Sequence, residues 1–330
     1  MICISRSPLR VSFFGGGTDY PEYFEVYPGA VLGASIDKFI YTTVLPMVGF
    51  AEHKYRITYR KVETVDTIDE IEHPAIRAVL REFGYNGALN IATLSDIPGN
   101  SGLGSSSSFT VGFIKLIEHL MGRNSSRLAL MREAVRIERD VLGDNVGIQD
   151  QVHASFGGLN HYHFHKSAFS AHPIAVSPEG RNALDESLFL VYSGVQRSAS
   201  TVVAQQIENT REKKIIKELK ELFDLCDEGA KVLQMSDPEK MLREFGKLIS
   251  AGWETKRRLS PNVSTPRIDD IYEAAMAAGA YGGKLCGAGG GGFILFSAPP
   301  AAQKKIKDLV GADNFVKIRT EDEGARIIAR

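Results

Sequence analysis

The stretch PGNSGLGSSSSF, residues 98–109, is the strongest local signal in this sequence. It joins a strand-like apolar run to a segment whose apolar residues recur at helical spacing from Ser105 onward. At the start of a helix several backbone N–H groups have no partner within the helix, and the helix dipole adds positive charge there. A glycine-rich loop that leads into a helix start therefore predicts a binding site for phosphate groups.

The spacing of the glycines in this stretch indicates which class of phosphate-binding loop it can be. Gly99 and Gly104 are separated as in a P-loop, but Ser105 stands where a P-loop needs lysine. A P-loop nucleoside triphosphatase is therefore disfavoured. The simpler alternative is a loop that ends in a serine N-cap, but four consecutive serines exceed what one cap requires.

Two further glycine-rich stretches lie far apart along the chain. Residues 13–20 read FFGGGTDY, and residues 282–296 read GGKLCGAGGGGFILF. The second contains Gly287-x-Gly289-x-x-Gly292, but a strand-like segment follows it, whereas the dinucleotide-binding fingerprint opens a helix. Each stretch is either a tight turn or a place where missing side chains let a ligand reach the backbone.

Two carboxylates flank a glycine-containing loop in ERDVLGDNVGIQDQ, residues 138–151. Taken singly, Glu138 and Asp150 would be ordinary solvated side chains. Next to a phosphate site, one carboxylate can hold Mg²⁺ and the other can orient an attacking hydroxyl. Enzymes that catalyse phosphoryl transfer use both roles.

Residues 161–165 read HYHFH and raise a separate question. On a strand, His161, His163 and His165 share one face. They could form a three-histidine metal site, but alternate polar residues on a half-exposed strand are far more common. We favour the second interpretation.

The bulk composition excludes several classes of function. The 330 residues carry a net charge of −1, which argues against general nucleic-acid binding. Three widely spaced cysteines offer neither a disulfide framework nor a paired metal motif, as in proteins of a reducing compartment. The first residues become polar too early for a signal peptide, and no apolar run approaches the ~18 residues of a membrane span. We expect a cytoplasmic protein without a membrane partner.

The order of elements predicts an α+β protein with two lobes. The first ~95 residues are rich in strand signals, which predict strands at residues 30–36, 39–46 and 54–62 among others, and helical patterns dominate from Ser105 to Leu142. Strands return near residues 157–165 and 187–194, helices occupy most of 201–258, and the strand GGFILFSA follows. The alternation lacks the regularity of a Rossmann fold. We place the lobes at residues 1–185 and 186–330.

Taken together, four stretches resemble the signature regions of the GHMP kinases, the superfamily of galactokinase, homoserine kinase and mevalonate kinase. They are SPLRVSFFGGGTDY, PGNSGLGSSSSF, GIQDQ and GGKLCGAGGGGF, and they span nearly the whole chain. The resemblance implies an N-terminal ATP-binding lobe like domain 2 of ribosomal protein S5 and a ferredoxin-like C-terminal lobe. ATP and substrate would lie in the cleft between them.

The resemblance also implies roles for individual residues. Asp150 matches the catalytic aspartate, Arg10 matches its basic partner, and Ser106 and Glu138 match the Mg²⁺ ligands, although four consecutive serines leave that register uncertain by one position. The ATP-binding residues would be Pro98, Gly99, Asn100, Gly102, Leu103, Gly104, Ser105, Ser106 and Ser107. The substrate-binding residues would be Gly16, Gly17, Thr18, Asp19, Arg197, Gly287, Ala288 and Gly289.

Within the superfamily, FFGGGTDYPEY and GAYGGKLCGAGGGGF resemble the sugar kinases that act on D-glycero-D-manno-heptose 7-phosphate. That implies phosphorylation of the anomeric hydroxyl and a supply of nucleotide-activated heptose for surface polysaccharide. An L-fucokinase-like enzyme is the nearest alternative, and a catalytically silent sugar- and ATP-binding regulator is another. A homodimer is left open. A phosphorylated substrate needs a cation, for which the candidates are Arg197, Lys256, Arg257 and Lys284.

Overall fold

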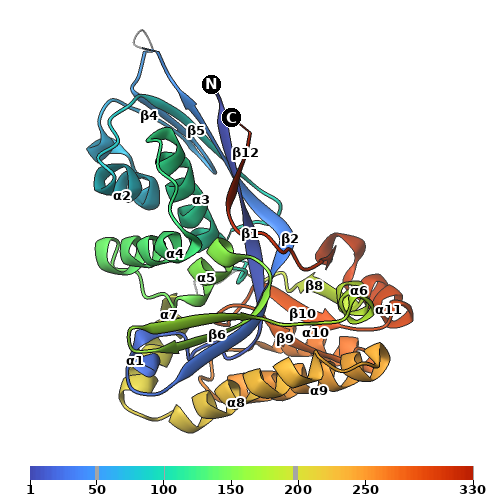
Figure 1. Cartoon of the computed structure of the whole chain (residues 1–330). Helices are drawn as coiled ribbons and strands as arrows, with labels where there is room; N and C mark the ends of the chain where they lie inside the picture. Colours follow the sequence, from blue (N-terminus) through green and yellow to red (C-terminus); the bar gives the residue numbers. More distant parts are fainter. Residues whose placement is uncertain (49–51, 100, 196–199, 330) are drawn as a thin grey trace.

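Two long antiparallel strands, β1 (Cys3–Phe14) and β2 (Gly29–Pro46), form the spine of the molecule (Figure 1). The computed structural model describes residues 1–48, 52–99, 101–195 and 200–329. The C-terminal half of β2 pairs with β5 (Leu89–Ser95), and its N-terminal half pairs with β6 (Leu159–His165). Leu9, Val11 and Phe13 of β1 and Leu32, Ile36 and Val44 of β2 are fully buried. The spine therefore links the upper and lower parts of the molecule.

The remaining strands of this first sheet lie on both sides of the spine. Within the described residues the order is β12–β1–β2–β5–β3–β4, and β6 and β7 branch from β2. The added strands are β3 (Tyr55–Thr58), β4 (Val62–Val65), β7 (Ala168–Pro173) and β12 (Arg326–Ala329). β12 pairs with β1, so the end of the chain returns to the first sheet after the second lobe is complete.

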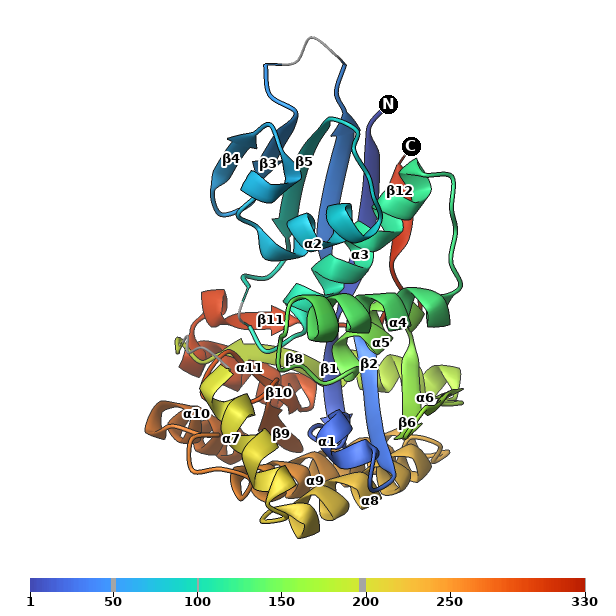
Figure 2. The same cartoon turned by 90° about the vertical axis from the view of Figure 1, so that its left-hand side faces the viewer.

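Helices cover one face of this sheet (Figure 2). They are α2 (Pro74–Glu82), α3 (Ser105–Leu120), α4 (Arg127–Arg136), the π-helical turn η2 (Ile137–Val141) and α5 (Gln149–Phe156), with the short η1 (Ile68–Glu70) and α1 (Pro21–Phe24) elsewhere on the lobe. α3 packs closely on β1 because Gly112 has no side chain; a Cβ there would collide with the Ser7 hydroxyl. α5 packs against both α3 and β1.

The second lobe is built on a smaller antiparallel sheet. Its strands are β8 (Leu188–Tyr192), β9 (Gly282–Leu285), β10 (Phe293–Ser297) and β11 (Phe315–Lys317), in the order β11–β8–β10–β9. Its helices are α6 (Pro178–Ser187), α7 (Ser200–Arg211), α8 (Ile216–Val232), α9 (Pro238–Arg257), α10 (Pro266–Ala277), α11 (Pro300–Val310) and η3 (Ala312–Asn314). Phe189, Trp253 and Phe296 are fully buried in its core.

The two lobes meet at the lower end of β1. Phe14 at the end of β1 contacts Phe245 of α9, with ring centroids 5.5 Å apart, and α8 packs under the same strand. The α+β, two-lobed architecture confirms the expected fold class. In the described part of the chain, no helix combines the length and apolar character that crossing a membrane would require.

Candidate active site

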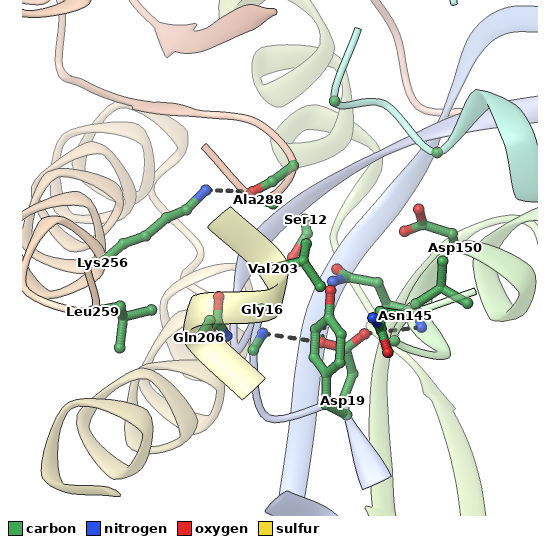
Figure 3. Close-up of a pocket in the computed structure, with 18 of the residues that line it drawn as sticks. Ser12, Gly16, Asp19, Asn145, Asp150, Val203, Gln206, Lys256, Leu259 and Ala288 are labelled. Carbon is green, nitrogen blue, oxygen red and sulfur yellow. Dashed lines mark hydrogen bonds between the residues drawn. The ribbon is translucent and has the colours of Figure 1, made fainter. Parts of the chain in front are cut away.

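A cavity of about 490 Å³ lies where the two lobes meet. Residues from β1, the glycine turn after it, the start of α5, α7, α9 and the loop after β9 line its walls (Figure 3). Predicted site residues on these walls are Arg10, Gly16, Gly17, Asp19, Gly102, Gly104, Asp150, Gly287 and Ala288. The fold therefore gathers all four signature stretches around one space.

Arg10 and Asp150 form the central ion pair of this cavity. Arg10 Nε donates to Asp150 Oδ1 at 2.8 Å, and Nη2 lies 2.7 Å from the same oxygen. Arg10 Nη1 donates to the Gly102 carbonyl at 2.6 Å, and the Arg10 backbone N–H donates to the Leu103 carbonyl at 3.1 Å. The arginine is 4% exposed. One buried guanidinium thus connects the carboxylate at the start of α5 to the glycine-rich loop.

The glycine-rich loop brings the start of α3 directly to Asp150. Gly104 is the N-cap of α3 with φ +75°, and a Cβ on it would lie 3.1 Å from Asp150 Cγ. The first hydrogen bond of the helix runs from Ser108 N–H to the Gly104 carbonyl at 2.9 Å. The N–H groups of residues 105–107 precede that bond, which is the backbone arrangement that binds anions. The predicted phosphate site therefore faces the predicted catalytic carboxylate.

The other predicted residues of this loop differ in how far they are buried. Pro98 and Gly99 are exposed, Leu103 is fully buried in the core, and Asn100 lies outside the described residues. Ser105 is half-buried and Ser106 is exposed on the first turn of α3. Leu103 therefore contributes its backbone to the loop while its side chain packs inside.

Glu138 lies behind the start of α3 in the π-helical turn. Its carboxylate accepts hydrogen bonds from Ser107 Oγ and Thr110 Oγ1, both at 2.8 Å, and from the Gln151 side-chain amide. Glu138 is 3% exposed, and this burial raises its pKa to about 7. Ser107, rather than Ser106, is thus the serine whose hydroxyl contacts Glu138. Thr110 Oγ1 also lies 3.2 Å from the Ser106 carbonyl oxygen, so the same hydroxyl contacts Glu138 and the backbone of Ser106.

Asp19 is fully buried at the floor of the cavity. Its Oδ1 accepts from the Gly17 N–H at 3.0 Å and from Gln149 Nε2 at 3.1 Å, and its Oδ2 accepts from the Gln149 N–H at 3.2 Å. Burial raises the pKa of Asp19 to about 6, although these donors oppose the shift. Asp19 therefore presents hydrogen-bond acceptors in a site shielded from water.

Thr18 and Gly289, two of the predicted substrate-binding residues, stabilise the backbone of their loops. Thr18 is fully buried, and its hydroxyl oxygen lies 2.8 and 2.7 Å from the carbonyl oxygens of Gly15 and Ala30 and accepts from the Ala30 N–H at 3.0 Å. Gly289 packs against Val263, where an added Cβ would lie 2.9 Å from Val263 Cα. Neither lines the cavity in the described part of the chain, so Thr18 fixes the glycine turn and Gly289 fixes the second glycine loop.

The second lobe contributes two buried lysines to the cavity. Lys256 Nζ donates to the Leu285 carbonyl at 3.0 Å and to the Gly287 carbonyl. Lys284 Nζ donates to the carbonyls of Ser12 and Phe13 at 2.9 and 2.8 Å. Burial lowers the pKa of Lys256 to about 7 and that of Lys284 to about 8. Of the four candidate cations, these two line the cavity.

Of the other two candidate cations, Arg257 lies in the described part of the chain. Arg257 points away from the cavity toward Asp269 and Glu254, at 3.4 and 3.6 Å. Arg197 lies outside the described residues.

Several cavity residues were not predicted from the sequence, among them Ser12, Tyr20, Asn145, Gln149, Val203 and Gln206. Ser12 could have been found, because it lies two residues after Arg10 on one strand and shares its face. Gln149 adjoins Asp150 in GIQDQ. Gln206 comes from α7, which carries no motif, so no signal in the sequence marks it.

The histidine-rich strand lies away from this cavity. His161 Nδ1 is 3.9 Å from Asp227 Oδ1, and the rings of His161 and His163 lie tilted against each other with centroids 4.0 Å apart. Burial lowers the pKa of His161 to about 4. Among the described residues, no group of three or more His, Cys, Asp or Glu side chains is arranged to hold a metal ion.

Comparisons with known proteins agree with this geometry. The family described as GHMP kinases N terminal domain matches residues 70–158, and GHMP kinases C terminal matches residues 238–315. A mevalonate kinase of Thermococcus gammatolerans is 30% identical over 260 residues, covering 77% of this chain and 73% of the relative. The chain belongs to the GHMP kinase family. It is therefore an ATP-dependent phosphotransferase with an alcohol group as acceptor.

Two further proteins are similar to this chain along most of their length. The D-glycero-alpha-D-manno-heptose 7-phosphate kinase of Campylobacter jejuni is 27% identical over 312 residues, covering 92% of this chain and 91% of the relative. A crystal structure of a D-glycero-D-manno-heptose 1-phosphate kinase from Bacteroides thetaiotaomicron superposes with a TM-score of 0.79. It covers 100% of this chain and 99% of its own at 22% identity, so it shows the shared fold.

Proposed function

We propose that this GHMP kinase transfers the terminal phosphoryl group of ATP to the anomeric hydroxyl of D-glycero-D-manno-heptose 7-phosphate, giving the 1,7-bisphosphate. The observation that carries the proposal is the Arg10 guanidinium, which contacts both Asp150 and the glycine-rich loop. It brings a carboxylate to the place where phosphates would bind. The similarity to the Campylobacter jejuni heptose 7-phosphate kinase supports the choice of acceptor.

In this proposal, Asp150 and Arg10 act on the reacting atoms. The acceptor oxygen bonds to the terminal phosphorus, the bond from that phosphorus to the ADP oxygen breaks, and the hydroxyl proton passes to the Asp150 carboxylate. Arg10 stabilises negative charge on the transferred group. The N–H groups at the start of α3 hold the phosphates of ATP, supported by the loop from Pro98 to Ser107.

The residues around Glu138 fit a Mg²⁺ ion. Mg²⁺ prefers oxygen ligands, and Glu138 presents a carboxylate beside the hydroxyl-rich start of α3. Glu138 and Ser106 would hold the ion, with Ser107, Thr110 and Gln151 orienting the carboxylate. When bound, Mg²⁺ neutralises charge on the phosphates of ATP.

Asp19 supplies the contact that selects a sugar. A buried carboxylate accepts strong hydrogen bonds from hydroxyl groups, and the bare backbone of Gly16 and Gly17 lets the ring approach. Gln206 and Gln149 line the same space. This arrangement suits a polyhydroxylated acceptor. Cytoplasmic location, a role in surface polysaccharide synthesis and a homodimer remain predictions.

Phosphorus and proton NMR would test the reaction directly. With ATP, Mg²⁺ and D-glycero-D-manno-heptose 7-phosphate, we expect a second sugar phosphate signal coupled to the anomeric proton as ADP forms. A new phosphate at another carbon, or no consumption of the heptose phosphate while L-fucose is consumed, would contradict the proposal. The second result would favour the fucokinase-like alternative, and ATP binding without any turnover would favour the silent regulator.

A further inference from the structure

Two buried ammonium groups face the cavity from the second lobe. Lys256 is 8% exposed on the last turn of α9, and Lys284 is 6% exposed on β9. Each Nζ donates to two backbone carbonyls, and an ammonium has three N–H donors. Within the described residues, one donor on each lysine is therefore left for a further acceptor.

Among the described residues, neither Lys256 nor Lys284 forms an ion pair with a carboxylate, and the third cation nearby, Arg10, is engaged by Asp150. A buried charge is costly unless an opposite charge accompanies it. Burial, Lys284 and Arg10 together lower the pKa of Lys256, and a bound anion would raise it again. A negatively charged ligand would supply the missing counterion for the two lysines.

The position of Lys256 indicates which part of the ligand is charged. In Figure 3, Lys256 reaches toward Ala288 from one side of the cavity, while Asp150 lies on the opposite side and Asp19 between them. A sugar held at Asp19 with its reacting hydroxyl at Asp150 would extend its far end toward Lys256. The transferred phosphoryl group, in contrast, must lie beside Asp150.

We propose that Lys256, with Lys284 beside it, forms an anion subsite that receives a phosphate group at the second-lobe wall of the cavity. This inference rests on the proposed function, and it assigns the subsite to the phosphate that the acceptor already carries. The terminal phosphate of ATP offers the same chemistry, and the experiment below separates the two sources. Lys284 also connects β9 to β1 through hydrogen bonds to the Ser12 and Phe13 carbonyls, so its replacement would disturb the contact between the strands. Lys256 is therefore the better residue to replace.

The first test uses inorganic phosphate as the probe, so it does not depend on the acceptor being a heptose. Calorimetry would follow phosphate binding to the wild-type protein, to Lys256→Met and to Arg257→Met, whose arginine points away from the cavity. We expect binding to weaken at least ~10-fold in Lys256→Met and to stay unchanged in the control. Equal binding in all three proteins would overturn the subsite. Circular dichroism melting would confirm that both variants are folded.

The second test separates the two sources of phosphate and needs no variant. Phosphate would be titrated into wild-type protein saturated with a non-hydrolysable ATP analogue. Binding that persists assigns the subsite to the acceptor, and binding that disappears assigns it to the terminal phosphate of ATP. Kinetics complete the comparison: the ratio of kcat/KM for heptose 7-phosphate to that for free heptose should fall at least ~30-fold in Lys256→Met. An unchanged ratio would contradict the acceptor assignment.

Discussion

Arg10 Nε lies 2.8 Å from Asp150 Oδ1, while the Nη1 atom of the same guanidinium lies 2.6 Å from the Gly102 carbonyl. The two partners are separated by about fifty residues and belong to a helix start and to a glycine-rich loop. Arg10 is therefore the physical link between the carboxylate assigned to the acceptor hydroxyl and the loop assigned to ATP.

Asp150→Asn should lower kcat by at least ~10²-fold, because an amide cannot accept the hydroxyl proton. The asparagine can still accept a hydrogen bond from Arg10, but the buried guanidinium loses its charged partner, so we expect the free energy of unfolding to fall by roughly 1–3 kcal/mol. Asp144→Asn is the matched control, since Asp144 lines the same cavity. Steady-state kinetics and thermal melting would measure both. Turnover near that of the wild type in Asp150→Asn would remove Asp150 from the mechanism.

Gly104→Ala should reduce kcat strongly while Gly99→Ala should not. Gly104 has φ +75°, and a Cβ there would lie 3.1 Å from Asp150 Cγ, so alanine strains the loop and displaces the carboxylate. Gly99 lies in the same loop with open space around its Cα. We expect a loss of at least ~10-fold for the first variant and less than ~2-fold for the second. Equal kinetics for the two would show that the loop does not position Asp150.

Changes around Glu138 should alter the Mg²⁺ requirement. Glu138→Gln should raise the Mg²⁺ concentration for half-maximal rate at least ~10-fold, because it removes a charged ligand. Ser106→Ala should raise it by a smaller factor, and Ser107→Ala should have less effect still, because the Ser107 hydroxyl is buried and already bonded to Glu138. The measurement is a Mg²⁺ titration at saturating ATP. A larger effect of Ser107→Ala than of Ser106→Ala would move the metal register by one residue.

The ionisation of Asp19 should make stability depend on pH. Its pKa is raised from 3.8 to about 6, so the native state favours the protonated form more than the unfolded state does. Relative to Asp19→Asn, the wild-type free energy of unfolding should fall as pH rises from about 4 to 6, by up to ~3 kcal/mol. Urea denaturation at several pH values would measure the difference, with Asp140→Asn at an exposed position as control. A difference that is constant with pH would contradict a buried, desolvated carboxylate.

Sequence patterns predicted most of the elements, and the misplaced boundaries have physical causes. We expected separate strands at residues 30–36 and 39–46, whereas β2 continues through Asp37 and Lys38 as one strand, with a register shift against β1 at these two residues. The chain's final segment explains this, since Asp37 N–H donates to the Arg319 carbonyl at 2.9 Å and extends the pairing. Such a distant partner leaves no mark in the local sequence.

In the segment after β2, one strand was predicted where the structure has two. KYRITYRKV was expected as one strand, but it forms two, β3 and β4, joined at Tyr59–Lys61. The turn is closed by a hydrogen bond from the Tyr59 N–H to the Lys61 carbonyl at 2.9 Å. It contains neither glycine nor proline, so no turn signal was present.

Some residues of the candidate site could be predicted from the sequence, and others could not. Arg10, Asp19 and Asp150 could be predicted because each stands within a recognisable motif. Gln206 and Lys256 reach the cavity only because α7 and α9 of the second lobe pack there, and neither helix carries a glycine-rich signature. Lys256 was named only as one cation among four, and its burial, which distinguishes it from the neighbouring Arg257, depends on which face of α9 meets β9.

The most direct test of the whole account is the acceptor preference of the wild-type enzyme. We would measure kcat/KM with D-glycero-D-manno-heptose 7-phosphate, with the unphosphorylated heptose and with L-fucose, at saturating ATP and Mg²⁺. The account predicts that the heptose phosphate is preferred at least ~30-fold, because its phosphate supplies the charge that the buried lysines lack. A free sugar that exceeds the heptose phosphate in kcat/KM would contradict the account.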